Sequence, residues 1–361
     1  MNSAAAHREA WASLSLHALP HADLVALLRA FVTPEAVLAA SRTQLSAVVP
    51  DAVVAKLAAP PADDALARTS AWLALPGHDL VAWDDPDYPQ ALLELGYAPP
   101  ALFFMGRREL LNRPALAIVG SRNATAQGKD NARNFAHALA DAGLTIVSGL
   151  ALGVDGAAHE GALMGTGSTL AVVGTGLDRV YPARHRDLAH RIAAEGGLLS
   201  EFPPGTPPRE WNFPRRNRLI SGLARGVLVV EAALQSGSLI TARLAGEQGR
   251  EVFAIPGSIH SPLAKGCHKL IREGAKLVET AQDILEEMGM VAKAVPLQSA
   301  AAAPMSESAL LAALADDPVD IDALAERTGL PAHAVTAELT ELELAGIVAA
   351  LPGGRWQRRR A

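Results

Sequence analysis

Short runs of β-branched and other apolar residues alternate with longer amphipathic stretches in the middle of the chain, and this alternation limits the fold more than any other feature. The apolar runs span residues 116–120, 144–149, 168–174, 198–201, 226–231, 251–257 and 276–278. The stretches between them, such as A-R-N-F-A-H-A-L-A-D-A, have the spacing of helices with one apolar face. Strands that are apolar along their whole length are typical of a parallel sheet covered on both faces. The sequence therefore predicts a doubly wound, mostly parallel α/β sheet.

The pattern changes at both ends of the predicted sheet, which divides this 361-residue chain into several parts. Residues 1–64 contain short stretches with helical spacing, include a T-P-E helix start at residues 33–35, and end in A-P-P-A-D-D. They predict a small helical domain followed by a linker. Residues 65–288 are expected to form the sheet domain, in which residues 66–115 are an N-terminal extension of the sheet.

The C-terminal part is predicted to be a winged helix. Residues 289–304 are rich in alanine and are expected to be a second linker. Residues 305–361 contain three stretches with helical spacing and then the hairpin-like run I-V-A-A-L-P-G-G-R-W-Q-R. Helix, helix, turn, helix and hairpin is the order of a winged helix, and the second helix ends at Thr328-Gly329, where the turn of a helix-turn-helix is expected.

The third of these helices is acidic. It carries Glu338, Glu341 and Glu343 and no basic residue, so phosphates would repel it from a major groove. Sequence-specific reading of duplex DNA, and with it a transcription factor, is therefore disfavoured. The tail carries the arginines Arg355, Arg358, Arg359 and Arg360. Either DNA contact is confined to this tail or the domain docks onto a protein, and we favour protein contact.

The cysteine content and the lack of long apolar runs indicate where the chain works. A single cysteine, Cys267, excludes an internal disulfide and a cysteine-based metal site, which fits a reducing environment. No apolar run reaches the length of a membrane span, and residues 1–10 lack an apolar signal core. We therefore expect a cytoplasmic protein without a membrane partner.

Charge is unevenly distributed along the chain. The net charge of −6 argues against a protein that is basic over its whole surface, so any nucleic-acid site must be local. Residues 201–225 carry five Arg against two Glu and form a basic strip. A short basic strip on an acidic protein suits a groove for a single strand better than a broad face for a duplex.

The basic strip centres on F-P-R-R-N-R-L-I-S-G-L at residues 213–223. Its arginines are Arg209, Arg215, Arg216 and Arg218. The apolar run that follows at once predicts that the guanidinium groups are held side by side on a fixed scaffold, where each can grip two phosphate oxygens. A solvated face, or ion pairs with Glu201 and Glu210, is the alternative.

Aromatic residues are scarce, at 4% of the chain, yet Phe202, Trp211 and Phe213 lie close to these arginines in the sequence. A single strand needs stacking platforms as well as cations, so Trp211 or Phe213 could stack on a base. Phe213 could equally anchor the following helix in the core.

The ends of the predicted strands open onto a common crevice, where ligands of such sheets bind. Small residues there let a ligand approach the backbone, and loop N–H groups at a helix start attract anions. Tight turns alone would also account for many of the glycines. The candidate crevice residues are Gly120, Gly149, Gly153, Asp155, Gly174, Gly176 and Glu231.

Two carboxylates of the crevice have more than one interpretation. Asp155 and His159 have the spacing of an acid–base pair or of two metal ligands on one helix face, but capping of a helix start by Asp155 is favoured. Glu231 is a candidate functional carboxylate, or it receives hydrogen bonds from the S-G-S loop at residues 236–238.

Walker and G-x-G-x-x-G signatures are missing, so we expect no cofactor, no metal and no catalytic residue.

Seven motifs follow one another through the predicted sheet domain. They are A-I-V-G-S-R (117–122), S-G-L-A-L-G-V-D-G-A-A-H (148–159), G-T-G-L-D-R-V-Y-P (174–182), N-F-P-R-R-N-R-L-I-S-G-L (212–223), E-A-A-L-Q-S-G-S-L-I-T-A-R-L-A (231–245), V-F-A-I-P-G (252–257) and S-P-L-A-K-G-C-H-K-L-I-R-E-G-A (261–275). In their order they resemble the DprA/Smf family of DNA-processing proteins, over roughly residues 80–288.

The resemblance implies an extended Rossmann fold between a small N-terminal domain of the sterile-alpha-motif (SAM) or helix-hairpin-helix type and a C-terminal winged helix. It also implies a homodimer, not an enzyme, that binds single-stranded DNA (ssDNA) and loads the RecA recombinase onto incoming strands during natural transformation. In the family, the glycine-serine-arginine loop and the F-P-x-R-N-R region line the DNA groove, and Lys265 lies in a further motif as a candidate phosphate contact. The candidate ssDNA-binding residues are Ser121, Arg122, Arg209, Asn212, Phe213, Arg215, Arg216, Asn217, Arg218, Ser236, Gly237, Ser238 and Lys265.

The enzyme alternative is a nucleotide phosphoribohydrolase of the lysine-decarboxylase-like family. The Rossmann core of that family is related to the one that the resemblance implies here. The P-G-G-x-G-T-x-x-E signature of that family is absent from the sheet domain, and the P-G-G of this chain starts at Pro352 in the tail hairpin. A nucleotide-binding hydrolase therefore stays the second hypothesis.

Overall fold

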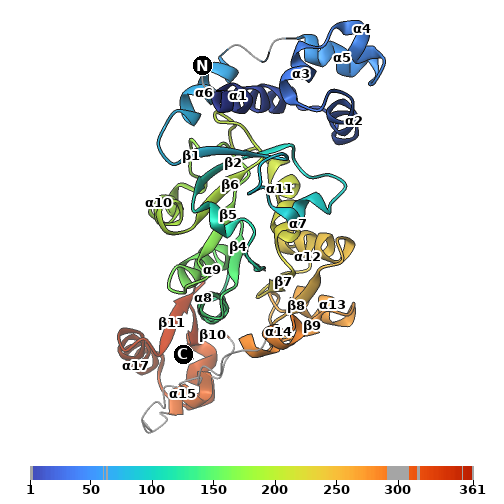
Figure 1. Ribbon diagram of the computed structural model, residues 1–361. Coiled ribbons are helices and arrows are strands. Elements are labelled where there is room, and N and C mark those ends of the chain that lie inside the picture. Colours follow the sequence, from blue (N-terminus) through green and yellow to red (C-terminus); the bar gives the residue numbers. More distant parts are fainter. Residues whose placement is uncertain are drawn as a thin grey trace.

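The computed structural model of the chain describes residues 3–59, 61, 64–290, 309–314, 318–351 and 353–359. Three parts follow one another in space as they do in the sequence (Figure 1): helices at the N-terminal end, a large twisted sheet with helices on both faces, and a small unit of helices and strands at the C-terminal end. Among the helices within these ranges, none is long and apolar enough to cross a membrane.

A nine-stranded sheet forms the centre of the molecule, with the order β1-β2-β6-β5-β4-β3-β7-β8-β9. The strands β3 to β9 run parallel to one another. The strand bounds are β1 (His78–Ala82), β2 (Ala101–Gly106), β3 (Ala115–Val119), β4 (Thr145–Ser148), β5 (Thr169–Val172), β6 (Gly197–Ser200), β7 (Gly226–Val229), β8 (Glu251–Ala254) and β9 (Lys276–Leu277). Each apolar run that predicts a strand overlaps one of β3 to β9, so the predicted doubly wound, mostly parallel sheet is confirmed.

Two antiparallel strands extend this sheet at one edge. β1 pairs with β2, and β2 pairs with β6. Both strands lie within residues 66–115, the segment predicted to extend the sheet. The domain boundary between residues 64 and 65 stays a prediction.

Helices cover both faces of the sheet because successive strand residues point to opposite sides. Ala117 and Val119 of β3 face α7, α11, α12 and α13, while Leu116 and Ile118 face α8, α9 and α14. The same side as α8 also receives α10, over β5 and β6. The helix bounds are α7 (Gln90–Leu93), α8 (Ala126–Asp141), α9 (Val154–Ala162), α10 (Arg186–Glu195), α11 (Asn212–Leu223), α12 (Gly237–Glu247), α13 (Lys265–Arg272) and α14 (Ala281–Glu287), with short 3-10 turns η1 (Arg108–Leu110) and η2 (Ala183–His185).

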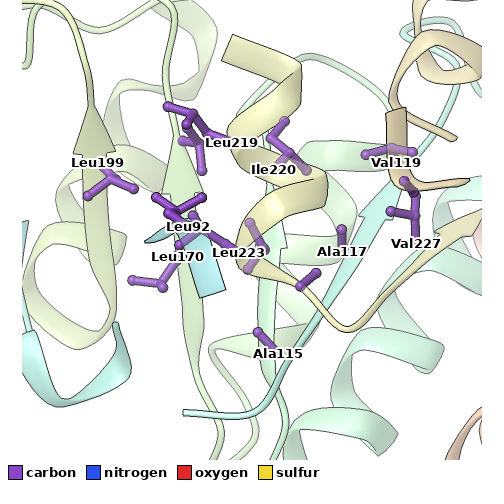
Figure 2. Close-up of a cluster of buried hydrophobic side chains, with 14 of the residues drawn as sticks. Leu92, Ala115, Ala117, Val119, Leu170, Leu199, Leu219, Ile220, Leu223 and Val227 are labelled. Carbon is purple, nitrogen blue, oxygen red and sulfur yellow. The ribbon is translucent and has the colours of Figure 1, made fainter. Parts of the chain in front are cut away.

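The helix α11 is anchored in the core by its C-terminal half. Figure 2 shows Leu219, Ile220 and Leu223 of this helix among the buried side chains of the sheet, which include Val119 and Leu170. All three α11 side chains are buried. The first turns of α11 therefore have a fixed position relative to the strand ends.

The N-terminal part is helical, as predicted. It contains α1 (Ser3–Leu16), α2 (His21–Phe31), α3 (Pro34–Ala39), α4 (Arg42–Ser46), α5 (Asp51–Ala58) and α6 (Ala65–Leu73). The hydroxyl of Thr33 accepts a hydrogen bond from the Ala36 N–H at 3.2 Å, which confirms the helix start predicted there. Trp11 of α1 and Trp72 of α6 are buried in a cluster that continues into Phe103 of β2, so these helices pack on the edge of the sheet.

The C-terminal unit is a winged helix, as predicted. Its elements are α15 (Ala309–Leu314), β10 (Val319–Asp320), α16 (Ile321–Thr328), α17 (Ala332–Leu344), β11 (Val348–Leu351) and β12 (Arg355–Arg358), and its strands pair in the order β10-β12-β11. Gly329, with a φ of 70°, ends α16 at the predicted turn. Residues 291–304 of the predicted linker and Arg360 of the tail lie outside the described residues.

The tail of the winged helix contacts the sheet domain. Arg359 donates two hydrogen bonds to the carboxylate of Asp130 on α8, at 2.8 and 2.9 Å. Asp130 also pairs with Arg133 at 2.9 Å. One of the arginines considered for DNA contact is thus engaged with the protein itself.

Candidate nucleic-acid interface

An open pocket of about 740 Å³ lies at the carboxyl ends of β3 and β7. These two strands are neighbours, yet the chain leaves them in opposite directions, from β3 to β4 on one side and from β7 to β8 on the other. Loops that diverge in this way leave a crevice between them, and doubly wound sheets bind ligands there. The pocket therefore has the position expected for the strand-end crevice.

Half of the candidate residues line this pocket. They are Gly120, Ser121, Arg122, Asp155, Phe213, Arg216, Asn217, Ser236, Gly237 and Ser238. The others lie outside its lining: Gly149, Gly153, Gly174, Gly176, Arg209, Asn212, Arg215, Arg218, Glu231 and Lys265. The fold thus brings together segments that are far apart in the sequence, but it divides the arginine-rich strip.

The arginine-rich stretch is a helix rather than a loop. α11 begins at Asn212, and successive residues of a helix are rotated by about 100° around its axis. Its arginines therefore point in different directions, and the predicted side-by-side row of guanidinium groups is wrong. Arg216 is 4% exposed, whereas the side chain of Arg215 is 57% exposed.

Arg215 and Arg218 form ion pairs with the buried carboxylate of Glu201. Their Nη2 atoms lie 3.1 and 2.5 Å from its Oε2, so the ion-pair alternative is confirmed for these two residues. Arg218 also stacks on Tyr97, with its guanidinium carbon 5.5 Å from the ring centre, and its side chain is 17% exposed. Arg215 stacks on Phe202 at 5.4 Å and stays at the surface, where it can still meet a phosphate.

Arg216 lines the pocket from a buried position. Its Nη1 donates to the carbonyl oxygens of Gly149, at 2.6 Å, and of Val172, which lie at the ends of β4 and β5. Its Nε has no hydrogen-bond partner among the described residues. Burial lowers the pKa of this guanidinium to about 10, against the effect of Asp155, so the group stays charged at neutral pH. The main role of Arg216 is therefore structural. The sequence had predicted a phosphate contact at the surface instead.

Asp155 is the acidic neighbour of Arg216. It is 6% exposed, and its Oδ2 accepts hydrogen bonds from the N–H groups of Gly149 and Ala151 at 3.1 and 3.3 Å. Burial raises its pKa, and the charge of Arg216 acts in the opposite direction. The residue that caps α9 is Gly153, so the predicted capping by Asp155 is wrong. Its carboxylate closes the loop before the helix instead.

His159 is separated from the pocket. Its Nδ1 lies 2.7 Å from the Thr169 hydroxyl, and its Nε2 accepts from the Leu150 N–H at 3.3 Å. The ring is fully buried, which lowers its pKa to about 3. The geometry therefore does not support an acid–base or metal-binding pair with Asp155. Within the described ranges, no group of three or more His, Cys, Asp or Glu could hold a metal ion.

Arg122 supplies the exposed cation of the pocket. It follows β3, and its guanidinium carbon lies 5.7 Å from the ring centre of Phe213. The loop that carries it is fixed, because Ser121 donates its N–H to the Glu231 carbonyl at 2.7 Å and accepts from the Val154 N–H at 3.2 Å. A rigid loop with an exposed arginine is suited to hold a phosphate at the pocket edge.

Glu231 anchors the loop after β3. Its carboxylate accepts hydrogen bonds from the N–H and the hydroxyl of Thr125, at 2.9 and 2.6 Å. The prediction that Glu231 receives hydrogen bonds from the S-G-S loop is therefore wrong. Burial raises the pKa of Glu231. A Cβ on Gly128 would lie 2.4 Å from its carboxyl carbon, so this glycine makes room for a structural carboxylate.

Two crevice glycines allow close packing rather than ligand access. A Cβ at Gly149 would lie 2.6 Å from Nη1 of Arg216. Gly153 has a φ of +81°, and a Cβ there would lie 2.2 Å from the Ser121 carbonyl oxygen. Gly237 differs, because it lines the pocket and has no atom within 4 Å of such a Cβ. Only at this last position does the missing side chain leave space for a ligand.

The start of α12 forms one wall of the pocket. The hydroxyl of Ser236 caps the helix by accepting the Ser238 N–H at 3.3 Å.

Two further candidate residues make contacts outside the pocket. Asn212 is buried and donates to the Gly174 carbonyl at 2.9 Å, which is a structural contact. The Lys265 ammonium donates to the Ile259 carbonyl oxygen, outside the pocket.

A second aromatic surface lies beside the pocket. Trp211 is 65% exposed, and the guanidinium carbon of Arg209 lies 5.3 Å from its ring centre. Both residues precede or begin α11 and are outside the pocket lining. They extend the basic and aromatic character of the rim.

Sequence reasoning does not identify Tyr181, which lines the pocket and is 46% exposed. Its ring centre lies 5.5 Å from that of Phe213, at an interplanar angle of 37°. The signal that could have found it is an aromatic residue in a strand-end loop of a chain with few aromatics. Tyr181 and Phe213, with Arg122 over the latter, form what we call the aromatic wall.

Comparison with known proteins agrees with this fold. The family model for DNA recombination-mediator protein A matches residues 79–289, which is more than half of the chain. A second family model, for the DprA winged helix domain, matches residues 294–354.

Two curated relatives share much of the sequence. Protein Smf of Escherichia coli (strain K12) is 48% identical over 301 residues, which are 80% of this chain and 80% of that protein. DNA processing protein DprA of Streptococcus pneumoniae is 50% identical over 203 residues, which are 56% of this chain and 72% of that protein.

Two solved structures are similar in fold and sequence. DprA from Streptococcus pneumoniae has a TM-score of 0.68 and 39% identity, over 77% of this chain and 97% of that one. DprA from Helicobacter pylori, whose structure is described as showing a single-stranded DNA binding mode, has a TM-score of 0.53 and 32% identity, over 58% of this chain and 95% of that one. The motifs, the fold and both family models agree, and the chain belongs to the DprA/Smf family of DNA-processing proteins.

Proposed function

We propose that this chain binds ssDNA at the strand-end pocket and passes the strand to the RecA recombinase. One observation carries the proposal: the exposed Arg122 stands at a pocket whose wall is formed by Phe213 and Tyr181. Cations hold phosphates, aromatic faces stack on bases, and proteins that bind single strands combine the two. The binding described for the Helicobacter pylori relative supports the same role here.

The dimensions of the site favour a single strand over a duplex. A pocket of about 740 Å³ is in the range of small-ligand sites and suits one or a few nucleotides. The bases of a duplex are stacked on one another, so their faces are closed to Phe213 and Tyr181. A single strand presents these faces. Exposed arginines at and near the rim, Arg122, Arg209 and Arg215, can hold its phosphates.

Delivery to RecA and a homodimeric, cytoplasmic state are parts of the same proposal. The description of the matching family as a recombination mediator supports a role between DNA and a recombinase. Assembly of RecA on a strand that is coated with single-strand-binding protein tests the delivery step. Addition of this protein is expected to shorten the lag before RecA ATPase activity, and an unchanged lag would contradict delivery.

Binding is tested by fluorescence anisotropy of labelled single-stranded and duplex oligonucleotides over a salt series. We expect tighter binding of the single strand, because counterion release and base stacking both contribute. Arg122→Ala should weaken binding and reduce the slope of log K against log salt by about 0.7 for each phosphate contact that is lost.

The matched control is Arg191→Ala on α10, an exposed arginine outside the pocket lining. It should bind as the wild type does. Unchanged affinity and slope in Arg122→Ala, or equal effects of the two substitutions, would contradict the assignment of the pocket.

A nucleotide-binding hydrolase is the second candidate, because a pocket between diverging strand-end loops is also a common nucleotide site. Incubation with nucleoside monophosphates followed by an assay for free base separates the two. Our proposal expects no release of base, and release that disappears in Asp155→Asn would favour the hydrolase.

A further inference from the structure

We propose that the winged helix is docked on the sheet domain through the ion pair between Arg359 and Asp130, and that bound ssDNA opens this contact by competing for the arginine. We call this ion pair the clasp. The inference rests on the proposed binding of ssDNA. It adds an internal contact that holds the wing, the β11–β12 hairpin, on α8 until DNA binds.

The clasp fixes the wing against α8. Nε of Arg359 donates to Oδ2 of Asp130 at 2.8 Å, and its Nη2 donates to Oδ1 at 2.9 Å. Two hydrogen bonds to one carboxylate fix the plane of the guanidinium as well as its distance. The backbone of Arg359 is also held, because its N–H donates to the Ile347 carbonyl at 2.8 Å beside the paired strands β11 and β12. The strands of the winged helix therefore lie next to α8 (Figure 1).

Asp130 has a second partner within the sheet domain. Nη1 of Arg133 lies 2.9 Å from Oδ1 of Asp130, and its Nη2 lies 2.8 Å from Oε2 of Glu160. The charges of Arg359, Asp130, Arg133 and Glu160 therefore alternate in sign. When Arg359 leaves, Arg133 still neutralises Asp130, so no buried carboxylate loses its only counter-charge. The sheet domain thus tolerates both the docked and the open state.

The clasp is weak enough to open. The side chain of Arg359 is 41% exposed, although that of Asp130 is only 13% exposed. Ion pairs with such an exposed member contribute little by themselves and are screened by salt. Both groups belong to one chain, so they meet at a high effective concentration, and a weak pair is sufficient to hold the domain. A phosphate offers the arginine fork the same paired oxygens as a carboxylate does, so it competes for the same donors.

The clasp lies close to the proposed DNA site. α8 begins at Ala126, shortly after the loop that carries Arg122. Asp130 is in the second turn of this helix, about 6 Å along its axis from Ala126. The chain from Arg122 to Asp130 therefore spans at most about 20 Å. A strand held by Arg122 brings further phosphates toward the clasp, where they repel Asp130 and attract Arg359.

Opening presents a basic surface that α17 does not have. Arg355 on β12 is exposed, and Arg359 follows the same strand. The helix α17 carries Glu338, Glu341 and Glu343 and no basic residue apart from the neutral His333. Phosphates therefore attract the wing rather than α17.

Distances between two spin labels report the clasp directly. Ala138→Cys on α8 and Thr340→Cys on α17 place the labels at exposed positions, and the native Cys267 is buried. Double electron–electron resonance on the full chain should give one narrow distance distribution at low salt. A saturating oligothymidine should broaden it toward longer distances. The same change is expected at about 1 M salt, where the Debye length is roughly 3 Å.

Two substitutions open the clasp from opposite sides. Asp130→Asn and Arg359→Ala should each give the broad distribution in the absence of DNA. Glu160→Gln is the matched control, because it removes a carboxylate of the same network and leaves the clasp intact. It should keep the narrow distribution. Because Arg133 keeps Glu160 as a partner, the melting temperature of Asp130→Asn should be close to that of the wild type.

The affinity for a labelled oligothymidine gives the second measurement. Glu160→Gln shows what the loss of one negative charge does by itself. Asp130→Asn should bind roughly 1.5- to 5-fold more tightly than Glu160→Gln, the factor that corresponds to an exposed ion pair. The double variant Asp130→Asn with Arg359→Ala should lose this difference, because the released arginine is then missing.

The outcomes separate the clasp from the function on which it rests. If the wild type does not bind ssDNA, the proposed function fails. If the wild type binds with a salt slope that Arg122→Ala reduces, but the label distances stay the same on binding, only the clasp is overturned. The clasp is also overturned if Asp130→Asn keeps the narrow distribution or binds no more tightly than Glu160→Gln.

Discussion

Replacing Arg216 by alanine is expected to destabilise the protein far more than replacing Arg215, although the sequence assigns both residues to DNA binding. Arg216 is 4% exposed, and its Nη1 donates to the carbonyl oxygens of Gly149 and Val172. Its charge also faces the buried Asp155. Removal would leave strand-end carbonyls without a donor and a carboxylate without its counter-charge.

The magnitude follows from the buried position. Hydrogen bonds to a charged donor contribute about 1.5–3 kcal/mol each, and removal of one partner of a buried charge pair costs about 3–5 kcal/mol. These values describe overlapping contacts, so we take about 3–5 kcal/mol for Arg216→Ala. The side chain of Arg215 is 57% exposed, and its pair with Glu201 is worth at most about 1 kcal/mol.

Thermal unfolding followed by circular dichroism measures the difference. For a domain of this size, about 1 kcal/mol shifts the melting temperature by roughly 2–4 °C, so Arg216→Ala should melt roughly 6–20 °C below the wild type. Arg215→Ala should melt within about 4 °C of it. Adding Asp155→Asn to Arg216→Ala should restore part of the loss, because the unpaired carboxylate is then removed.

The stability of Arg216→Ala should also depend on pH. In Arg216→Ala, burial of Asp155 still raises its pKa above the usual 3.8, so the native state holds the proton more tightly than the unfolded chain does. The stability of the variant should therefore fall as pH rises from 3.8 through the raised value. Equal melting temperatures for Arg216→Ala and Arg215→Ala would refute the account of a buried structural cation.

Two further predictions concern groups outside the pocket. Although burial favours the neutral ring, hydrogen bonds and charge from Glu35 and Asp84 raise the pKa of His7 above 6.5, so its contribution to stability is complete below that value and is lost as pH rises through the raised pKa. The melting temperature of His7→Leu should therefore fall further below that of the wild type in mildly acidic than in alkaline buffer, and a constant difference would contradict this pairing. Burial raises the pKa of the Cys267 thiol to about 12, so an aromatic disulfide reagent should label the native protein slowly at neutral pH and the denatured protein at once. Rapid labelling of the native protein would show that the site opens easily.

The sheet and the winged helix could be predicted because both depend on local patterns. The apolar runs that predict strands contain buried residues on both faces, as Leu116 and Ala117 of β3 illustrate, and this is the signature of a covered parallel sheet. Gly329 ends α16 by a local requirement for positive φ. Such signals do not depend on distant parts of the chain.

The arginine-rich helix was harder to predict because its charges suggest a loop. The buried residues Asn212, Arg216, Leu219, Ile220 and Leu223 follow one helical stripe. Extending the stripe from the apolar residues toward the N-terminus of the helix places Arg216 on the buried side. The acceptors of its hydrogen bonds, the carbonyl oxygens at the ends of β4 and β5, are brought there by the assembled sheet and have no signal in the local sequence.

The contact partners of the crevice residues could not be predicted from the sequence either. Glu231 and Thr125 are 106 residues apart, and only the adjacency of β3 and β7 brings them together. Tyr181 reaches the pocket from the segment after β5, and its contact with Phe213 depends on the orientation of α11. Local propensity carries no information on such pairs. The positions of Arg122, just after β3, and of Gly237, at the start of the helix that follows β7, could in contrast be predicted from the topology of the sheet.

The central claim is that the bases of a single strand meet the aromatic wall of the pocket between β3 and β7. Irradiation of the wild-type complex with an oligonucleotide that carries 5-iodouracil, followed by mass spectrometry of the cross-linked peptides, tests this most directly. We predict cross-links at Tyr181 or Phe213. Cross-links found only in the winged helix or the N-terminal helices would contradict the claim.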